Sequence, residues 1–535
     1  MPPSLAFTII TIILAIAGSI NGALAALPPT TTTILIETRT VLARTDPTRF
    51  ASFSFDFTSL FGVQRTFIPF TDARLRQYAR NLAPAYVRFG GSLQDRTVSV
   101  FAGVPQPAAA PPSMLVLALN ESVFDGLVNF ADATGLDLVY GLNAAVGRQT
   151  AAGGSASWDA ENALAPVVRA AARGFRIPVV ELGNEVNVFN CSKDGSAKMS
   201  PAQLAAQYAI TAATVRELLP GTRFWGSDSS ITGDVVGQCH DYFGDDIFGF
   251  NREMFAQPGW SDLIDAYSWH YYSQDSRNVT STASLILSDE YQARLLNADS
   301  QSRALRDAAA PGLPILLGET ASFWAGGKAN VSNRFASGFY YLPQLANLAS
   351  RGYLTHIRQD LAGGDYGMVE LVLDDAGAVV DFSPNPDYFS HALWQRLVSG
   401  TILLANVTSP VGAPRVHAWA ACGARAAGGA NGGITIIFAN FDATPAPVTF
   451  AFAGGLSLGD IRHEYILTAG DAIAGLASST IRLNDAILTM GNDLLLPPLT
   501  PFVSAGNATL VLPQLSYGFL VFPLAQGGGA CGSSV

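Results

Sequence analysis

Apolar, β-rich segments alternate with helical patterns along the first three quarters of the chain. One helix signal is clear: Ser200, Pro201 and Gln203 form a capping box with proline at the first helical position, and Pro220 ends the helix. The apolar segments, each ending in a polar residue or glycine, are 50–58, 85–92, 136–144, 179–185, 222–230, 265–272, 314–322 and 353–361. Eight strands alternating with helices predict an α/β fold, a (β/α)8 TIM barrel over residues 45–388.

The pattern changes after residue 388 to short strands separated by turn residues. The expected strands are 433–440, 447–452, 463–467, 494–497 and 517–523. They predict a C-terminal β-sandwich domain over residues 389–535. Residues 26–44 include an alternating, β-branched stretch ahead of the first barrel strand, and we expect it to join the sandwich as an N-terminal strand.

The first 25 residues have the pattern of a secretory signal peptide. The apolar run 5–17 is too short to span a bilayer, and Ala23-Leu24-Ala25 supplies a small-x-small cleavage site, although a retained anchor is the alternative. We therefore expect the secretory pathway, with an extracellular, cell-wall, vacuolar or lysosomal destination and no stable membrane insertion after signal removal. The chain has six glycosylation sequons typical of a glycoprotein, at Asn120, Asn190, Asn278, Asn330, Asn406 and Asn507.

Composition narrows the class of partner. Hydrophobic residues make up 49% and charged residues 14% of the 535 residues, which indicates a globular chain with a large core. The formal net charge of −11 disfavours nucleic acid or an anionic membrane surface as the main partner.

The four cysteines are more consistent with disulfides than with metal binding. In an oxidising compartment an even number of cysteines tends to pair, and four allow three pairings. Their order in the chain favours Cys191 with Cys239 and Cys422 with Cys531. Since none has CxxC spacing and no histidines recur at i, i+4, we expect no metal site and no cofactor.

Two glutamates lie where barrel strands end. Glu185 closes the segment ELGNE at 181–185 after the fourth strand, and Glu319 lies in LGET at 317–320 in the seventh. Either glutamate alone could cap a helix or pair with an arginine. Strands four and seven nearly face each other across a barrel mouth, so the two carboxylates can share one pocket. A separation of about 5 Å is what retaining glycoside hydrolysis requires.

With these segments the chain resembles glycoside hydrolase family 79, the heparanase and β-glucuronidase family of clan A. The likeness runs from about residue 50 to residue 531. It includes AYVRFGG at 85–91, GLDLVYGLNA at 135–144, ELGNE at 181–185, WHYY at 269–272, LGET at 317–320 and GDY at 364–366.

The resemblance implies a retaining β-glucuronidase that works by double displacement through a covalent glycosyl-enzyme. It implies Glu185 as general acid/base, Glu319 as nucleophile and Asn184 as the residue that holds the sugar 2-hydroxyl. We expect Tyr271, after the sixth strand, to donate a hydrogen bond to Glu319. We also expect an acidic optimum, because Glu185 faces a negative charge in a partly dry cleft and should retain its proton at mildly acidic pH.

The resemblance also implies how a uronate carboxylate is held, namely by Tyr366 and by backbone N–H groups of a turn at 325–327 that includes Gly326. Ala325 departs from the family's usual glycine at the start of this turn. The resemblance further implies a disulfide between Cys422 and Cys531. The implied partner is a carbohydrate bearing β-glucuronic acid, on a glycan, a proteoglycan-type chain or another glycoconjugate.

Four more residues complete the expected pocket. Asp56 and Ser92, at the tips of the first two strands, resemble the family's contacts to sugar hydroxyls, with helix capping as the alternative for each. Arg88 and Trp269 are expected to shape the pocket wall. Residues 114–128, where family members that cut sulfated chains carry lysine-rich segments, contain no Lys or Arg, so we expect a terminal glucuronic acid as substrate and a single uncut chain.

Two other functions remain open from the sequence. One is a clan A β-glycosidase that acts on a neutral sugar such as glucose or xylose. The other is a carbohydrate-binding protein that has kept the fold without the chemistry.

Overall fold

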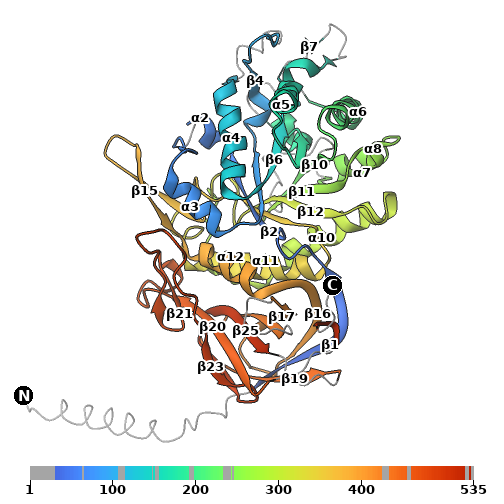
Figure 1. Cartoon of the computed structure of the whole chain (residues 1–535). Coiled ribbons are helices and arrows are strands. Elements are labelled where there is room, and N and C mark those ends of the chain that lie inside the picture. Colours follow the sequence, from blue (N-terminus) through green and yellow to red (C-terminus); the bar gives the residue numbers. More distant parts are fainter. Residues whose placement is uncertain are drawn as a thin grey trace, which may run out of the picture.

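The chain folds into a barrel surrounded by helices and a mostly antiparallel sheet beneath it (Figure 1). In this computed structural model the barrel fills the upper part of the view, and the sheet combines strands from both ends of the chain. The structure describes residues 31–62, 66–106, 115–146, 149–150, 156–191, 198–232, 243, 246–424, 433–454, 459–523 and 529–531.

Eight parallel strands close the barrel, in the order β10, β11, β12, β13, β2, β3, β6, β9. Their bounds are β2 Ala51–Asp56, β3 Tyr86–Gly90, β6 Asp137–Leu142, β9 Val179–Leu182, β10 Arg223–Thr232, β11 Ala266–Tyr272, β12 Ile315–Thr320 and β13 His356–Arg358. Each overlaps one of the eight predicted segments, so the predicted (β/α)8 fold is confirmed. Apart from β10, every residue of these strands is buried, because one face fills the barrel and the other packs against helices.

Helices surround the barrel and begin at recognisable caps. Ser200 caps α6 with the reciprocal hydrogen bonds of a capping box, as predicted, and Gly135 ends α4 in the left-handed conformation. The α-helices are α2 Phe57–Phe61, α3 Ala73–Asn81, α4 Glu121–Thr134, α5 Ala160–Arg173, α6 Pro201–Leu218, α7 Gly249–Phe255, α8 Trp260–Leu263, α9 Ala283–Ile286, α10 Asp289–Ala309, α11 Gly338–Ser350 and α12 Pro386–Leu397. The 3₁₀ turns are η1 Gln94–Arg96, η2 Val186–Cys191, η3 Phe335–Ser337, η5 Gly475–Ala477 and η6 Gly529–Cys531.

Three short pairs of strands lie in the described segments that connect or follow the barrel strands. They are β4 Thr97–Ser99 with β5 Leu117–Leu119, β7 Gln149–Thr150 with β8 Ala156–Ser157, and β14 Val369–Leu373 with β15 Val379–Pro384.

The remaining strands form one eleven-stranded sheet, in the order β22, β21, β20, β25, β18, β17, β16, β1, β19, β24, with β23 paired to β20. β1 lies between β16 and β19, antiparallel to the first and parallel to the second. The bounds are β1 Thr32–Arg44, β16 Val398–Thr408, β17 Val416–Gly423, β18 Gly433–Asn440, β19 Ala446–Ala453, β20 Ile461–Ala469, β21 Ile481–Leu483, β22 Ala486–Ile487, β23 Phe502–Ala505, β24 Leu510–Leu512 and β25 Ser516–Pro523.

This sheet curls over itself and so encloses a core as a sandwich does. Phe522 of β25 makes ring contacts with Phe450 and Phe452 of β19, although four strands separate β25 from β19 in the sheet order. Cys422 of β17 and Cys531 of η6 form a disulfide with Cα atoms 5.3 Å apart, which agrees with the predicted pairing. One predicted strand is wrong, because residues 494–497 form no regular structure.

Helices α11 and α12 lie between the barrel and the sheet (Figure 1). Tyr517 of β25 stacks on Phe335 and packs edge-on against Phe339, with both ring centroids 4.9 Å away. A side chain at Gly338 would lie within 2.0 Å of the Tyr517 ring, so glycine is needed for this close approach. The sheet therefore braces the barrel through one continuous apolar core.

Within the described residues, no helix has both the length and the apolar character needed to cross a bilayer.

Candidate active site

Two irregular strands shape the carboxyl end of the barrel. Relative to β11, strand β10 carries one extra residue at Asp228 and strand β12 carries one at Gly318. Such a bulge bends a strand and changes the direction of nearby side chains. The bulge at Gly318 brings Glu319 level with His270, and it requires glycine because a Cβ there would lie 2.2 Å from the Ser268 hydroxyl oxygen.

Glu319 points into the barrel mouth from β12 and is held by two donors. The Tyr272 hydroxyl donates to Glu319 Oε1 at 2.7 Å, and Arg88 Nη1 donates to Oε2 at 2.7 Å. Its side chain is 9% exposed. Hydrogen bonds from a phenol and a guanidinium stabilise negative charge on a carboxylate and fix its orientation.

Glu185 lies on the turn that follows β9. Gly183 adopts a φ of 75°, and a Cβ there would lie 2.5 Å from Val186 Cγ2, so glycine is needed at this turn. Glu185 itself has a φ of 53°, and its N–H donates to the Asp228 carbonyl at 2.8 Å. This anchor directs a side chain that is 20% exposed into the barrel mouth.

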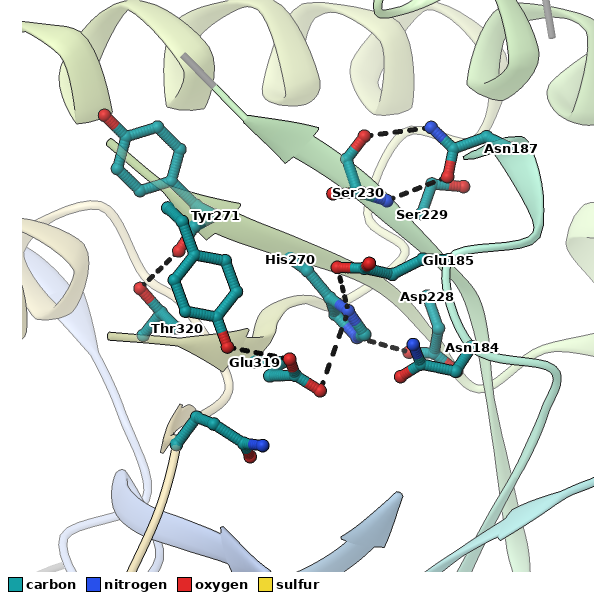
Figure 2. Close-up of polar contacts among 12 residues, drawn as sticks. Asn184, Glu185, Asn187, Asp228, Ser229, Ser230, His270, Tyr271, Glu319 and Thr320 are labelled. Carbon is teal, nitrogen blue, oxygen red and sulfur yellow. Dashed lines mark hydrogen bonds and ion pairs between the residues drawn. The ribbon is translucent and has the colours of Figure 1, made fainter. Parts of the chain in front are cut away.

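The two predicted glutamates meet in one site. One carboxylate oxygen of each, together with a ring nitrogen of His270, lie within 4.8 Å of one another. Figure 2 shows the three side chains pointing toward one another from β11, β12 and the turn after β9. Retaining glycosidases need two carboxyl groups about 5 Å apart, and this pair meets that requirement.

The predicted contact of Tyr271 with Glu319 is wrong, because Tyr272 makes it instead. Alternate residues of a strand point to opposite faces, so His270 and Tyr272 face the barrel interior while Tyr271 faces the helices. The Tyr271 hydroxyl is buried without a hydrogen-bond partner among the described residues, and its ring packs against Trp269.

His270 contacts both glutamates and was not predicted as a site residue. Its Nδ1 lies 3.2 Å from Glu185 Oε1 and 4.0 Å from Glu319 Oε2 (Figure 2). Burial alone would lower the pKa of His270, but the carboxylates of Glu319, Asp228 and Glu185 outweigh burial and raise it to about 9. The surrounding carboxylates thus favour the imidazolium form of His270. The alternation of 265–272 contained this signal, since residue 270 shares a face with 272.

Arg88 is a central part of the site rather than only a wall. From β3 its guanidinium donates to Glu319, to Glu181 Oε2 at 2.6 Å and to Asn184 Oδ1 at 3.0 Å. The guanidinium of Arg88 is fully buried, and its hydrogen bonds orient both the carboxylate of Glu319 and the amide of Asn184. Trp269, expected in the wall, instead faces outward and donates its indole N–H to the Tyr353 hydroxyl at 3.2 Å.

Asp95 fixes the backbone beside Asn184. Its carboxylate accepts the N–H groups of Asn184 and Ala144, each at 2.7 Å, and so ties the turns after β6 and β9 together. Burial raises the pKa of Asp95 to about 7 despite these two hydrogen bonds.

The residues expected to hold a uronate lie beside the nucleophile. Gly326 accepts the N–H of Asp365 at 2.7 Å and of Tyr366 at 3.2 Å, which joins the turn after β12 to the segment after β13. Tyr366 is buried and packs in one cluster with Tyr272. Ala325 adopts a φ of 60°, a left-handed conformation that glycine adopts more easily than alanine does.

The structure gives Asp56 and Ser92 different settings. Asp56 caps α2 by accepting the Thr58 N–H at 2.8 Å, as in the alternative considered for it, and also accepts Gln359 Nε2 at 3.0 Å. Ser92 lies on the exposed turn after β3. Cys239 lies outside the described residues, as does the side chain of Cys191, so their predicted pairing stays a prediction.

Glu185, His270 and Glu319 could each offer one ligand atom to a metal ion. Glu319 already accepts hydrogen bonds from Tyr272 and from Arg88, and the guanidinium beside its carboxylate opposes a second positive charge there.

Comparison with known families agrees with this geometry. The family model described as "Glycosyl hydrolase family 79, N-terminal domain" matches residues 58–346, a range that contains both glutamates.

Several characterised relatives are similar over most of their length. Mouse heparanase is 27% identical over 496 residues, which covers 85% of this chain and 86% of the relative. Heparanase-like protein 1 of Arabidopsis thaliana is 24% identical over 491 residues, 82% of each chain. Mouse inactive heparanase-2 is 29% identical over 418 residues, 76% of this chain and 64% of the relative.

Solved structures share the fold. A family 51 arabinofuranosidase from Xanthomonas axonopodis pv. citri superimposes with a TM-score of 0.61 at 15% identity, covering 92% of this chain and all of the other. A 4-O-α-L-rhamnosyl-β-D-glucuronidase from Fusarium oxysporum gives 0.58 at 17% identity with the same coverage.

Proposed function

The chain belongs to glycosyl hydrolase family 79, and we propose that it is a retaining β-glucuronidase. In this proposal it removes β-linked glucuronic acid from glycans, proteoglycan-type chains or other glycoconjugates in the secretory pathway or outside the cell. The observation that carries the proposal is the convergence of the Glu185 and Glu319 carboxylates within 4.8 Å at the mouth of the barrel.

The reaction takes place in two displacements at the anomeric carbon. First, a Glu319 oxygen forms a bond to this carbon while Glu185 gives its proton to the leaving glycosidic oxygen, whose bond to the carbon breaks. Then Glu185 takes a proton from water, the water oxygen bonds to the anomeric carbon, and the bond to Glu319 breaks. The released glucuronic acid keeps the β configuration.

The hydrogen bonds around Glu319 suit a nucleophile. Tyr272 and Arg88 orient its carboxylate for attack, and because Arg88 also donates to Asn184, the same guanidinium orders the amide expected to contact the sugar 2-hydroxyl. Such preorganised donors lower the barrier because they need no reorganisation during the reaction.

The neighbourhood of Tyr366 supports a uronate over a neutral sugar. Tyr366 packs in one cluster with Tyr272, which donates to Glu319, and the turn at Gly326 accepts the N–H of Tyr366, so in this proposal a uronate carboxylate meets Tyr366 and this turn. Neutral donors can hold one carboxylate without a basic side chain.

The proposal is tested by turnover of aryl β-D-glucuronide against aryl β-D-glucoside and aryl β-D-xyloside. We expect hydrolysis of the glucuronide and at least about a hundredfold loss of kcat in Glu185→Gln and Glu319→Gln variants. Faster turnover of a neutral glycoside would favour the neutral-sugar glycosidase, and no turnover of any would favour the non-catalytic carbohydrate-binding protein.

A further inference from the structure

We propose that Asp228 and His270 form a buried ion pair that keeps a positive charge between the two catalytic carboxylates. The inference rests on the proposed function for its catalytic consequence. It makes Asp228 and His270 positioning residues, which act on the reaction through Glu185 and Glu319.

The geometry of the His270 ring carries the inference. Its Nε2 lies 3.7 Å from Asp228 Oδ1 on one side, and its Nδ1 lies 3.2 Å from Glu185 Oε1 and 4.0 Å from Glu319 Oε2 on the other (Figure 2). Both ring nitrogens thus face carboxylate oxygens. The 3.7 Å contact with Asp228 is an ion-pair distance rather than a hydrogen bond, and Nε2 has no hydrogen-bond partner among the described residues. Only the imidazolium form has a proton on both nitrogens and a positive charge for the carboxylates on both sides.

Asp228 needs a charged partner where it lies. The residue is fully buried, and neither carboxylate oxygen has a hydrogen-bond partner among the described residues. A buried carboxylate is costly unless an opposite charge compensates it. The ring of His270, equally buried, is the cation that approaches Asp228 from β11.

The backbone ties Asp228 to the acid/base turn as well. Asp228 and Glu185 both adopt a φ of 53°, a left-handed conformation that aspartate visits more readily than glutamate, and the N–H of Glu185 donates to the carbonyl of Asp228. Strained residues of this sort persist where the surrounding structure holds them and often mark functional sites. Asp228 therefore anchors the backbone of Glu185 and also pairs with His270, whose ring contacts the Glu185 side chain.

The other charged groups around His270 come from three strands. Arg88 of β3 opposes a second positive charge, whereas Glu319 of β12 and Glu181 of β9 favour it. The carboxylates outnumber the guanidinium, in agreement with the raised pKa of His270.

The pair has a consequence for catalysis. A permanent imidazolium stabilises the ionised forms of both glutamates, so it moves both limbs of the pH–rate profile to lower pH. Loss of the His270 ring would remove this stabilisation and move both limbs to higher pH, whereas loss of Asp228's charge would lower the pKa of His270.

The first test does not depend on activity. Full-length protein labelled with ¹⁵N-histidine contains six histidines, and comparison with His270→Gln assigns the signals of His270. We expect His270 to remain an imidazolium above pH 8, and Asp228→Asn to lower its titration midpoint by about one pH unit or more. If the Asn variant does not fold, Asp228→Ser replaces it. Titration of the wild-type ring near pH 6.5, or an unchanged midpoint in the folded variant, would overturn the inference.

The second test follows kcat/KM against pH for an aryl β-glucuronide. We expect the alkaline limb to move to higher pH in His270→Gln, which removes the imidazolium at every pH. An unmoved or lowered limb would contradict the inference. Lack of turnover by the wild type would reject the proposed function, and the ¹⁵N titration would still decide on the ion pair.

Discussion

At the scale of single residues, two adjacent tyrosines on β11 have opposite tasks. Tyr272 donates to Glu319, the proposed nucleophile, whereas Tyr271 points outward into the core between strand and helices. Side chains of a strand alternate between its two faces, so of these two neighbours only Tyr272 can reach the carboxylate of Glu319.

Replacing Tyr272 by phenylalanine should therefore lower kcat for aryl glucuronide about tenfold or more, since a hydrogen bond to a charged group contributes about 1.5–3 kcal/mol. Tyr271→Phe is the matched control and should remain near the wild-type rate, because its hydroxyl has no hydrogen-bond partner among the described residues. Steady-state kinetics of both variants test this. Equal losses in the two variants, or a larger loss in Tyr271→Phe, would contradict the assignment.

The carboxylates of the site were predictable from sequence and their neighbours were not. Glu319 directly follows a glycine and Glu185 lies two residues after one, each at the end of an apolar run, and such polar strand ends gather at one mouth of a barrel. The contacts of His270, Asp228 and Tyr272 depend on bulges in β10 and β12. A bulge inserts one residue and reverses the facing of those that follow, which alternation alone does not reveal.

At the scale of elements, the turn between β9 and η2 positions the acid/base. Gly183 combines a φ of 75° with a Cβ direction blocked by Val186 and Ala144. Any side chain there must displace the backbone that carries Asn184 and Glu185.

Gly183→Ala should lower kcat/KM by about ten- to a hundredfold, since a displacement of about 1 Å at a reacting group has effects of this size. Gly174→Ala is the control, because Gly174 has a similar φ of 65° at the end of α5 but nothing within 4 Å of its Cβ position. The control should lose about 1 kcal/mol of unfolding free energy and keep its kinetics. Matching losses of activity in both variants would mean that general destabilisation, not the turn, is responsible.

Elements with long buried apolar runs were predictable, and irregular edges were not. The eight barrel segments and α6 were identified because buried parallel strands and capping boxes have strong local signals. The segment 494–497 is apolar but adjoins two prolines, and it forms no strand. Strands β16 and β17 escaped prediction, since their burial alternates irregularly and their partners are distant in the chain.

At the scale of the whole molecule, the sheet forms from both ends of the chain and its closure depends on long-range pairing. Sequence patterns indicated strands of a sandwich, but not that β1 lies between β16 and β19 or that one continuous sheet curls to bring β19 onto β25. Such contacts depend on packing between segments hundreds of residues apart, which leaves no local signature.

The disulfide should stabilise this sheet more than it affects catalysis. Cys422 and Cys531 are 109 residues apart, and on the chain-entropy model a cross-link of that span contributes about 4–5 kcal/mol. Cys422→Ser with Cys531→Ser should lower Tm in calorimetry while kcat at 25 °C stays within about twofold of wild type, because both cysteines lie outside the barrel that carries the two glutamates. An unchanged Tm would contradict this prediction.

Stability should fall as the pH rises from 7 to 9. The raised pKa of His270, about 9, means that the folded state binds more protons than the unfolded chain between about pH 6.5 and 9. Below pH 6.5 the raised pKa of Asp95, about 7, is opposed by buried His356 and His391, whose pKa burial lowers to about 3. Carboxyl groups with a lowered pKa, such as Asp125 beside Arg169, stabilise the folded state only through ionisation below this pH range, so they do not change the trend.

Urea unfolding at pH 7, 8 and 9 measures this trend, and the midpoint concentration should decrease at each step. His270→Gln is the control, since it should remove this decrease. A midpoint that increases toward pH 9 would show that the imidazolium is assigned incorrectly.

The central claim is that Glu319 forms a covalent bond to the sugar, and trapping tests it most directly. A 2-deoxy-2-fluoro-glucuronyl fluoride slows the second displacement, so the glycosyl-enzyme accumulates and the labelled peptide can be located by mass spectrometry. The account predicts time-dependent inactivation with one sugar on Glu319, and no labelling of Glu319→Gln. A label on any other residue, or full activity after prolonged exposure, would contradict it.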